Sequence, residues 1–186
     1  MSFKSITQRL SMLTILWLLP LALVEGKVRE PFEVQQEGIQ LIGQTENVAR
    51  EISQNADRLK SFAHTGQVSV STHKDHLMQI KDLVNEDLRP MLDRLTEIQP
   101  DLPEWQQDTI GQMLESAKRL ASNTNLAILN INENGRLPVV LNEDYRGFVS
   151  QIDEHGAVLV KTADAAGDYA GAHQKAMDAG LTVPKY

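Results

Sequence analysis

Apolar residues recur every three or four positions along most of the chain after residue 30, and this spacing predicts helices rather than strands. The first predicted helix runs from about Pro31 to Ala63, because a proline suits a first helical turn and Gly66 suits a helix end. Its apolar seam consists of Ile39, Ile42, Val48, Ile52, Ala56, Leu59 and Phe62. Gly38 and Gly43 each cost about 1 kcal/mol against alanine inside a helix, so we expect the first turns to be frayed or separate.

The second predicted helix begins at Thr72, which lies three residues before Asp75 in a capping-box arrangement. Its seam has alternating 4-3-4 spacing and consists of His73, Leu77, Ile80, Val84, Leu88, Met91, Leu95 and Ile98. Pro90 lies inside this seam, where it removes a backbone hydrogen bond and clashes with the preceding turn. We therefore predict a kink near Glu86 rather than the end of the helix.

The third and fourth helices are delimited by turn and capping residues. Asp101 is the expected cap of the third helix, with Pro103 in its first turn. The third seam reads Trp105, Ile110, Met113, Ala117, Leu120, Thr124, Ala127 or Ile128, and Ile131. Asn142 is the expected N-cap and Gly180 the expected C-cap of the fourth helix. The fourth seam reads Tyr145, Phe148, Ile152, His155, Leu159, Thr162, Ala166, Tyr169, His173 and Ala176.

Four amphipathic segments joined by short turns predict an all-α fold. The expected architecture is an antiparallel up-down-up-down four-helix bundle with long helices over residues 27–180, followed by a C-terminal tail at 181–186. The apolar residues of the seams are spaced as in coiled coils. They can therefore be buried within one chain, or part of them can stay exposed and pack against a second copy of the chain.

The first 26 residues have the pattern of a cleavable secretory signal peptide. Lys4 and Arg9 form a basic start, an apolar run follows at 12–24, and cleavage is expected after Gly26. Only 15 residues separate Arg9 from Glu25, whereas a bilayer-spanning helix needs about 20. We expect a secreted or periplasmic protein without a stable membrane span after signal removal, and an uncleaved anchor is the alternative.

Charge and cysteine content exclude several classes of function. The formal net charge is −7, which disfavours nucleic acid as a partner. The chain has no cysteine, which excludes disulfides, cysteine-ligated zinc or iron–sulfur sites and thioether-bound haem. We expect no cofactor.

The sharpest candidates for chemistry are histidines. His73 and His76 lie three residues apart on a predicted helix and could face one metal ion. The structural alternative is that His73 fills the seam and that His76 faces solvent. His155 is a second candidate, because a buried imidazole needs a hydrogen-bond partner such as Thr124 or Thr162.

The sequence contains no catalytic motif of the Gly-x-Ser-x-Gly, His-Glu-x-x-His or glycine-rich phosphate-loop type. We therefore expect a non-enzymatic helical-bundle protein that acts through protein–protein contacts or self-association in the cell envelope or outside it. The alternative is a small-ligand or metal-binding, sensor-like bundle that uses the seam positions Thr124, His155 and Thr162 or the His73/His76 pair. The order of signal segment and four helices is also similar, in architecture alone, to chemoreceptor sensing domains. An asparagine cluster is a possible recognition surface at the end of the third helix: Asn123, Asn125, Asn130, Asn132 and Asn134.

Overall fold

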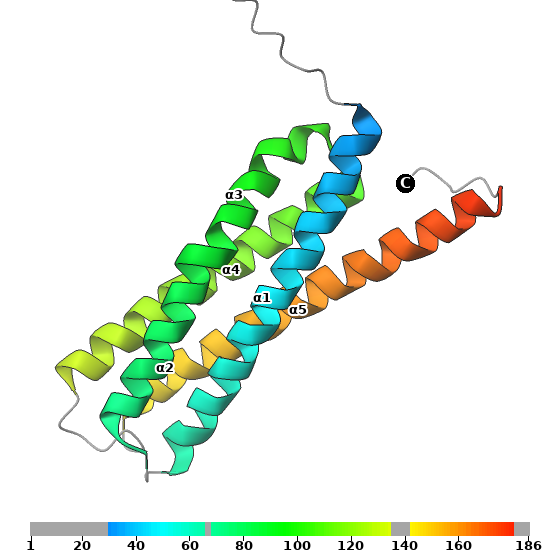
Figure 1. Ribbon diagram of the computed structural model, residues 1–186. Helices are drawn as coiled ribbons and strands as arrows, with labels where there is room; N and C mark the ends of the chain where they lie inside the picture. The colour runs from blue at the N-terminus through cyan, green and yellow to red at the C-terminus, as the bar shows by residue number, and fades with distance from the viewer. Residues whose placement is uncertain (1–29, 66–67, 135–141, 181–186) are drawn as a thin grey trace, which may run out of the picture.

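The computed structural model describes residues 30–65, 68–134 and 142–180, and these ranges are helical apart from short connections. In chain order the helices are α1 (Pro31–Thr65), α2 (Val70–Asp82), the π-helix η1 (Leu83–Leu88), α3 (Arg89–Ile98), the 3-10 helix η2 (Gln99–Asp101), α4 (Glu104–Glu133) and α5 (Glu143–Asp178). Because α2, η1 and α3 follow one another directly, the described chain has four long helical segments and no strand (Figure 1). The predicted signal peptide and C-terminal tail lie outside the described residues.

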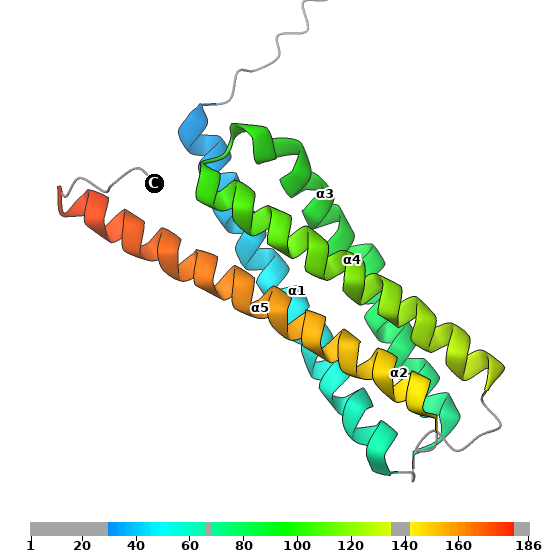
Figure 2. The same cartoon turned by 180° about the vertical axis from the view of Figure 1, so that it is seen from behind.

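The four segments pack side by side as in a bundle. α1 contacts α5 on one side and α2, η1 and α3 on the other, and α4 also contacts α5 and the α2–α3 segment (Figures 1 and 2). The prediction of an all-helical, bundle-like chain is confirmed. Within the described ranges, none of the helices has the length and apolarity needed to cross a bilayer.

A single aliphatic core lies between the four segments. Its largest fully buried side chains are Tyr145, Ile52, Leu59, Leu77, Ile80, Leu88, Leu95, Ile110, Met113, Leu120, Ile152 and Leu159. Burial of each Leu, Ile or Met side chain contributes about 1.5–3 kcal/mol, so these seams are the main source of stability.

The seam of α5 lies partly one residue later than the sequence predicted. Three predicted core residues are only half-buried: Phe148, His155 and Thr162. The residues buried in their place are Val149, Gly156 and Ala163. The reason is a close approach of α1, since a Cβ added at Gly156 would lie 3.3 Å from the Cα of Ser53. Only a small residue fits there, and this contact fixes the rotation of α5.

Pro90 leads to a π-helix inside the second segment rather than to a helix end. The amide of Arg89 donates to the carbonyl of Val84, five residues earlier, as in a π-turn. Because the turn is wider, four successive buried residues of this segment follow one another at intervals of four positions: Ile80, Val84, Leu88 and Leu92. Leu92 is therefore buried and Met91 is not, which corrects one position of the predicted seam.

The helix caps confirm some sequence predictions and correct others. Asn142 caps α5, its side chain accepting a 3.0 Å hydrogen bond from the Tyr145 amide, and Gly180 follows the helix with φ +69°. The cap of α2 is Ser69, which accepts from the amide of Thr72, so the helix begins earlier than predicted. Pro103 rather than Asp101 precedes α4.

Gly38 does not fray α1, which is continuous from Pro31 to Thr65. The glycine is buried, and a Cβ at this position would come within 3.1 Å of a Leu102 methyl group. Glycine lowers the intrinsic stability of the helix here, but its missing side chain lets the connection between α3 and α4 pack directly on the backbone of α1.

Candidate functional site

A buried histidine joins three helices at one end of the bundle. His73 of α2 is fully buried, and its Nδ1 lies 3.0 Å from the hydroxyl of Tyr145 on α5. The ring of Phe62 on α1 meets the imidazole edge-on at a centroid distance of 6.3 Å. Burial lowers the pKa of His73, with nearby His76 as a second cause, and burial raises the pKa of Tyr145. The pair is therefore neutral at pH 7.

The second predicted metal ligand, His76, lies beside this pair rather than in solvent. Its ring is half-buried at 5.4 Å from the centroid of Phe62. Two buried imidazole nitrogens, Nε2 of His73 and Nδ1 of His76, have no hydrogen-bond partner among the described residues. They could offer two ligands to an ion, although the described residues bring no third His, Asp or Glu to them.

The other predicted polar site does not form. The hydroxyl of Thr124 donates to the carbonyl of Leu120 in its own helix at 2.9 Å. His155 is half-buried and close to Glu115, whose pKa is lowered chiefly by Arg119 and only in small part by His155. His155 thus faces the outer side of the α4–α5 contact.

The asparagine cluster has a structural role at one position. Asn130 of α4 accepts a 2.7 Å hydrogen bond from the side-chain amide of Asn142, which is the cap of α5. The cluster therefore helps to hold the start of α5 against the end of α4.

A polar groove that the sequence did not reveal lies on the described surface. It lies between α1 and the α2–η1 segment and has a volume of about 770 Å³. Its lining residues are Asn47, Arg50, Glu51, Gln54, Asn55, Arg58, Gln79, Asp82, Leu83, Glu86 and Asp87. We call it the acidic groove. It runs beside the π-helix, a backbone irregularity that is frequent at functional sites.

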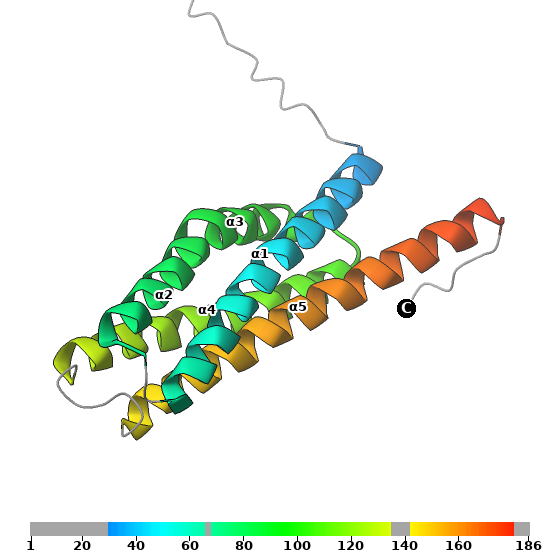
Figure 3. The same cartoon turned by 60° about the horizontal axis from the view of Figure 1, so that its bottom comes forward.

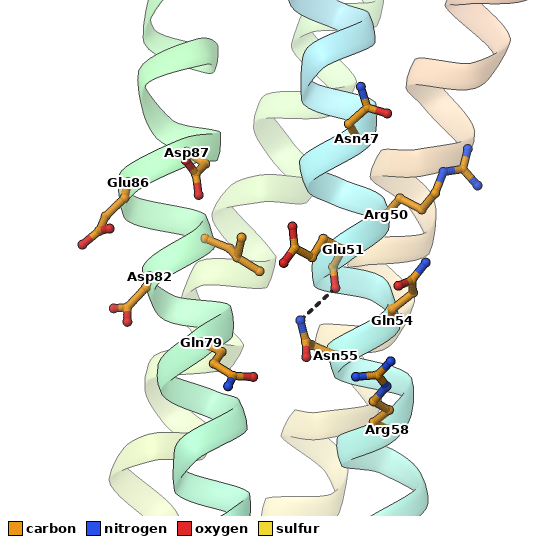
Figure 4. Close-up of a pocket in the computed structure, with 11 residues that line it drawn as sticks. Asn47, Arg50, Glu51, Gln54, Asn55, Arg58, Gln79, Asp82, Glu86 and Asp87 are labelled. Carbon is orange, nitrogen blue, oxygen red and sulfur yellow. Dashed lines mark hydrogen bonds between the residues drawn. The ribbon is translucent and has the colours of Figure 1, made fainter.

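Figure 4 shows which of these side chains enter the gap between the helices. Glu51 from α1 and Asp87 from η1 point into it from opposite sides, and the amides of Asn55 and Gln79 lie further along. By contrast, Arg50 points to the other side of α1.

The charges of the acidic groove are not balanced within the described chain. Glu51 and Asp87 make no ion pair there, whereas Arg50 pairs with Glu46 outside the gap. Inside the groove, the side-chain amide of Asn55 donates to the backbone carbonyl of Glu51 at 3.1 Å. Two unpaired carboxylates flanked by amides form a surface that attracts cations.

Comparisons with known proteins give no relative for this chain. No protein-family model matches it, and no curated protein or solved structure gives a significant match.

Proposed function

We propose that this protein is an exported, non-enzymatic helical bundle that binds another protein through the acidic groove. The observation that carries the proposal is the pair Glu51 and Asp87, which point into one groove from two helices without an ion-pair partner in the described chain. The partner chemistry that fits is a basic segment that places a lysine or arginine between these carboxylates.

The surroundings of the two carboxylates support recognition of a peptide segment. The side-chain amides of Asn55 and Gln79 can donate to and accept from a partner backbone. Leu83, which is half-buried, gives the groove an apolar contact. Charged contacts of this kind accelerate association and select partners, and they weaken as salt rises.

Export and helix direction are part of the proposal. The basic start, apolar run and Gly26 cleavage position of the leader support secretion into the periplasm or the medium. The short connection η2 between α3 and α4 supports an up-down-up-down order of the four segments. Mass spectrometry of the protein isolated from its own cells tests export: we expect a chain that begins at Lys27, and an intact Met1 in a soluble cellular fraction would oppose it.

Site-specific photo-crosslinking in the cells that make the protein tests the groove. A photoreactive residue replaces Gln79, which borders the gap, and the matched control replaces Asp82, which points away from the gap on the same segment (Figure 4). We expect one discrete adduct from position 79, lost with Glu51→Gln and Asp87→Asn together and retained with Glu86→Gln. Equal adducts from both positions, or none from position 79, would oppose the proposal.

The unpartnered nitrogens of His73 and His76 favour a second candidate function, metal binding. Titration with zinc, copper and nickel salts tests it, with His64→Ala as the matched control because His64 is exposed and bonded to its own helix. Loss of affinity with His73→Ala and His76→Ala, but not with His64→Ala, would support this candidate. Unchanged affinity in the double variant would exclude it.

A further inference from the structure

An apolar notch lies between the start of α1, the start of α4 and the end of α5. It has a volume of about 80 Å³, and its lining residues are Phe32, Gln35, Gln36, Ile39, Trp105, Ala170, His173, Gln174 and Met177. Figure 3 shows the last turns of α5 leaving the bundle at this end. No residue of α5 after Ala166 is fully buried in the described chain.

The rim of the notch carries large apolar side chains that the described residues leave uncovered. Phe32 is 65% exposed, Met177 58% and Tyr169 40%. The Tyr169 ring lies 4.9 Å from that of Trp105, so the rim includes an aromatic pair. Exposed apolar clusters of this kind mark surfaces that another segment covers.

The backbone leaves the helical conformation at the end of α5, next to this notch. Gly180 has φ +69°, the left-handed conformation that ends a helix and reverses the chain direction. Its amide donates to the carbonyl of Met177, which itself lines the notch. The next residue, Leu181, is apolar, as the position after such a glycine commonly is when it folds back on the last turn.

We propose that residues 181–186 dock in the apolar notch of the same chain. Six extended residues reach about 20 Å, while the helix from Gly180 back to Ala170 is about 15 Å long. The segment Leu-Thr-Val-Pro-Lys-Tyr offers apolar side chains at Leu181, Val183 and Tyr186. Its Pro184 favours an extended conformation, which suits aromatic-lined grooves such as the one beside Trp105.

Docking of the tail would have two consequences for the protein. It covers the apolar rim and so prevents association between copies at this end. It also leaves the acidic groove untouched, because the groove and the notch share no lining residue. Docking of the tail in the notch and binding of a partner in the acidic groove are therefore independent, and one can be disproved without the other.

Fluorescence of Trp105 tests the docking directly. The chain has two tryptophans, Trp17 and Trp105, so Trp17→Phe in the full chain leaves Trp105 as the single emitter. Removal of residues 181–186 is expected to shift its emission to the red and to raise acrylamide quenching about twofold, because the indole loses an apolar cover. A synthetic Leu-Thr-Val-Pro-Lys-Tyr peptide added in excess is expected to reverse both changes.

Two further measurements keep the test decisive. Leu129→Ala, at an exposed apolar position outside the notch, is the matched control and should leave the emission unchanged. Far-ultraviolet circular dichroism confirms that the truncated chain is folded, and Tyr186→Ala gives a milder version if it is not. Unchanged emission and quenching after truncation would overturn the proposal, as would a Trp105 signal that depends on protein concentration, which would mean that a second copy covers the notch.

Discussion

α1 packs chiefly against two segments, α5 and the α2–η1–α3 segment, and the two contacts differ. Toward α5 the backbones approach so closely that Gly156 lies directly against Ser53. Between α1 and η1, by contrast, lies the acidic groove, and Glu51 and Asp87 point into it. Phe62 of α1 and His73 of α2 also make a direct ring contact. Side-chain size and charge on the faces of one helix thus decide where the bundle is closed and where a partner can enter.

The strongest way to break the closed contact is to enlarge Gly156. Gly156→Leu should lower the free energy of unfolding by about 3 kcal/mol, because a side chain there collides with backbone and the helices must separate. The matched control is Gly167→Ala, also in α5 but with open space around it, which should stabilise by about 0.5–1 kcal/mol. Urea unfolding measures both, and equal effects would refute the close packing.

The hydrogen bond between His73 and Tyr145 has the next largest effect. Tyr145→Phe removes the partner of His73 Nδ1 without changing the shape of the core, and should cost about 1–2 kcal/mol. Tyr169→Phe, at an exposed position, is the control and should be neutral within about 0.5 kcal/mol. A Tyr145→Phe variant as stable as the parent would show that the bond contributes nothing.

Acid should weaken the same end of the molecule. Burial lowers the pKa of His73, so the unfolded chain binds a proton at higher pH than the folded chain does. This contribution to stability is fully present above the ordinary histidine pKa of about 6.5 and is lost as the pH falls below it. The loss is at most about 1.4 kcal/mol per pH unit for one group.

Unfolding free energies measured between pH 7.5 and 5 check this expectation. His73→Gln should flatten the pH dependence, whereas His64→Gln should leave it unchanged because that imidazole is exposed. If the unfolding free energy of the parent protein changed with pH as little as that of His73→Gln, His73 would not be the group responsible for the loss of stability in acid.

The acidic groove should matter least for stability and most for binding. Glu51→Gln with Asp87→Asn should change the free energy of unfolding by less than about 0.5 kcal/mol, since both side chains are exposed and unpaired. Chemical denaturation measures this change alongside the crosslinking yield at position 79. A large loss of stability would mean that the two carboxylates hold the fold rather than a partner.

Local features of the fold followed from the sequence. Pro31 begins α1, Asn142 caps α5 and Gly180 ends it, as predicted, because these residues act on their own turn of the helix. The all-helical class followed from the apolar spacing. The histidine pair was also recognised as a candidate, although its contact with Tyr145 was not.

The features that were missed depend on neighbours distant in the sequence. Gly38 was expected to fray a helix, yet it packs under Leu102. The acidic groove gave no signal, because Glu51 and Asp87 resemble any other exposed helix charges until α1 and η1 lie side by side.

The sequence by itself determined that this chain forms helices, where α1 and α5 begin, where α5 ends, and which residue types fill the seams, because these depend on contacts within a few residues. Only the tertiary structure decided the rotation of α5, the π-turn at Leu83–Leu88 and the groove beside it. The physical reason is that periodicity defines an apolar face only to within about one residue, and the closest backbone approach, at Gly156 and Ser53, then selects among the neighbouring rotations.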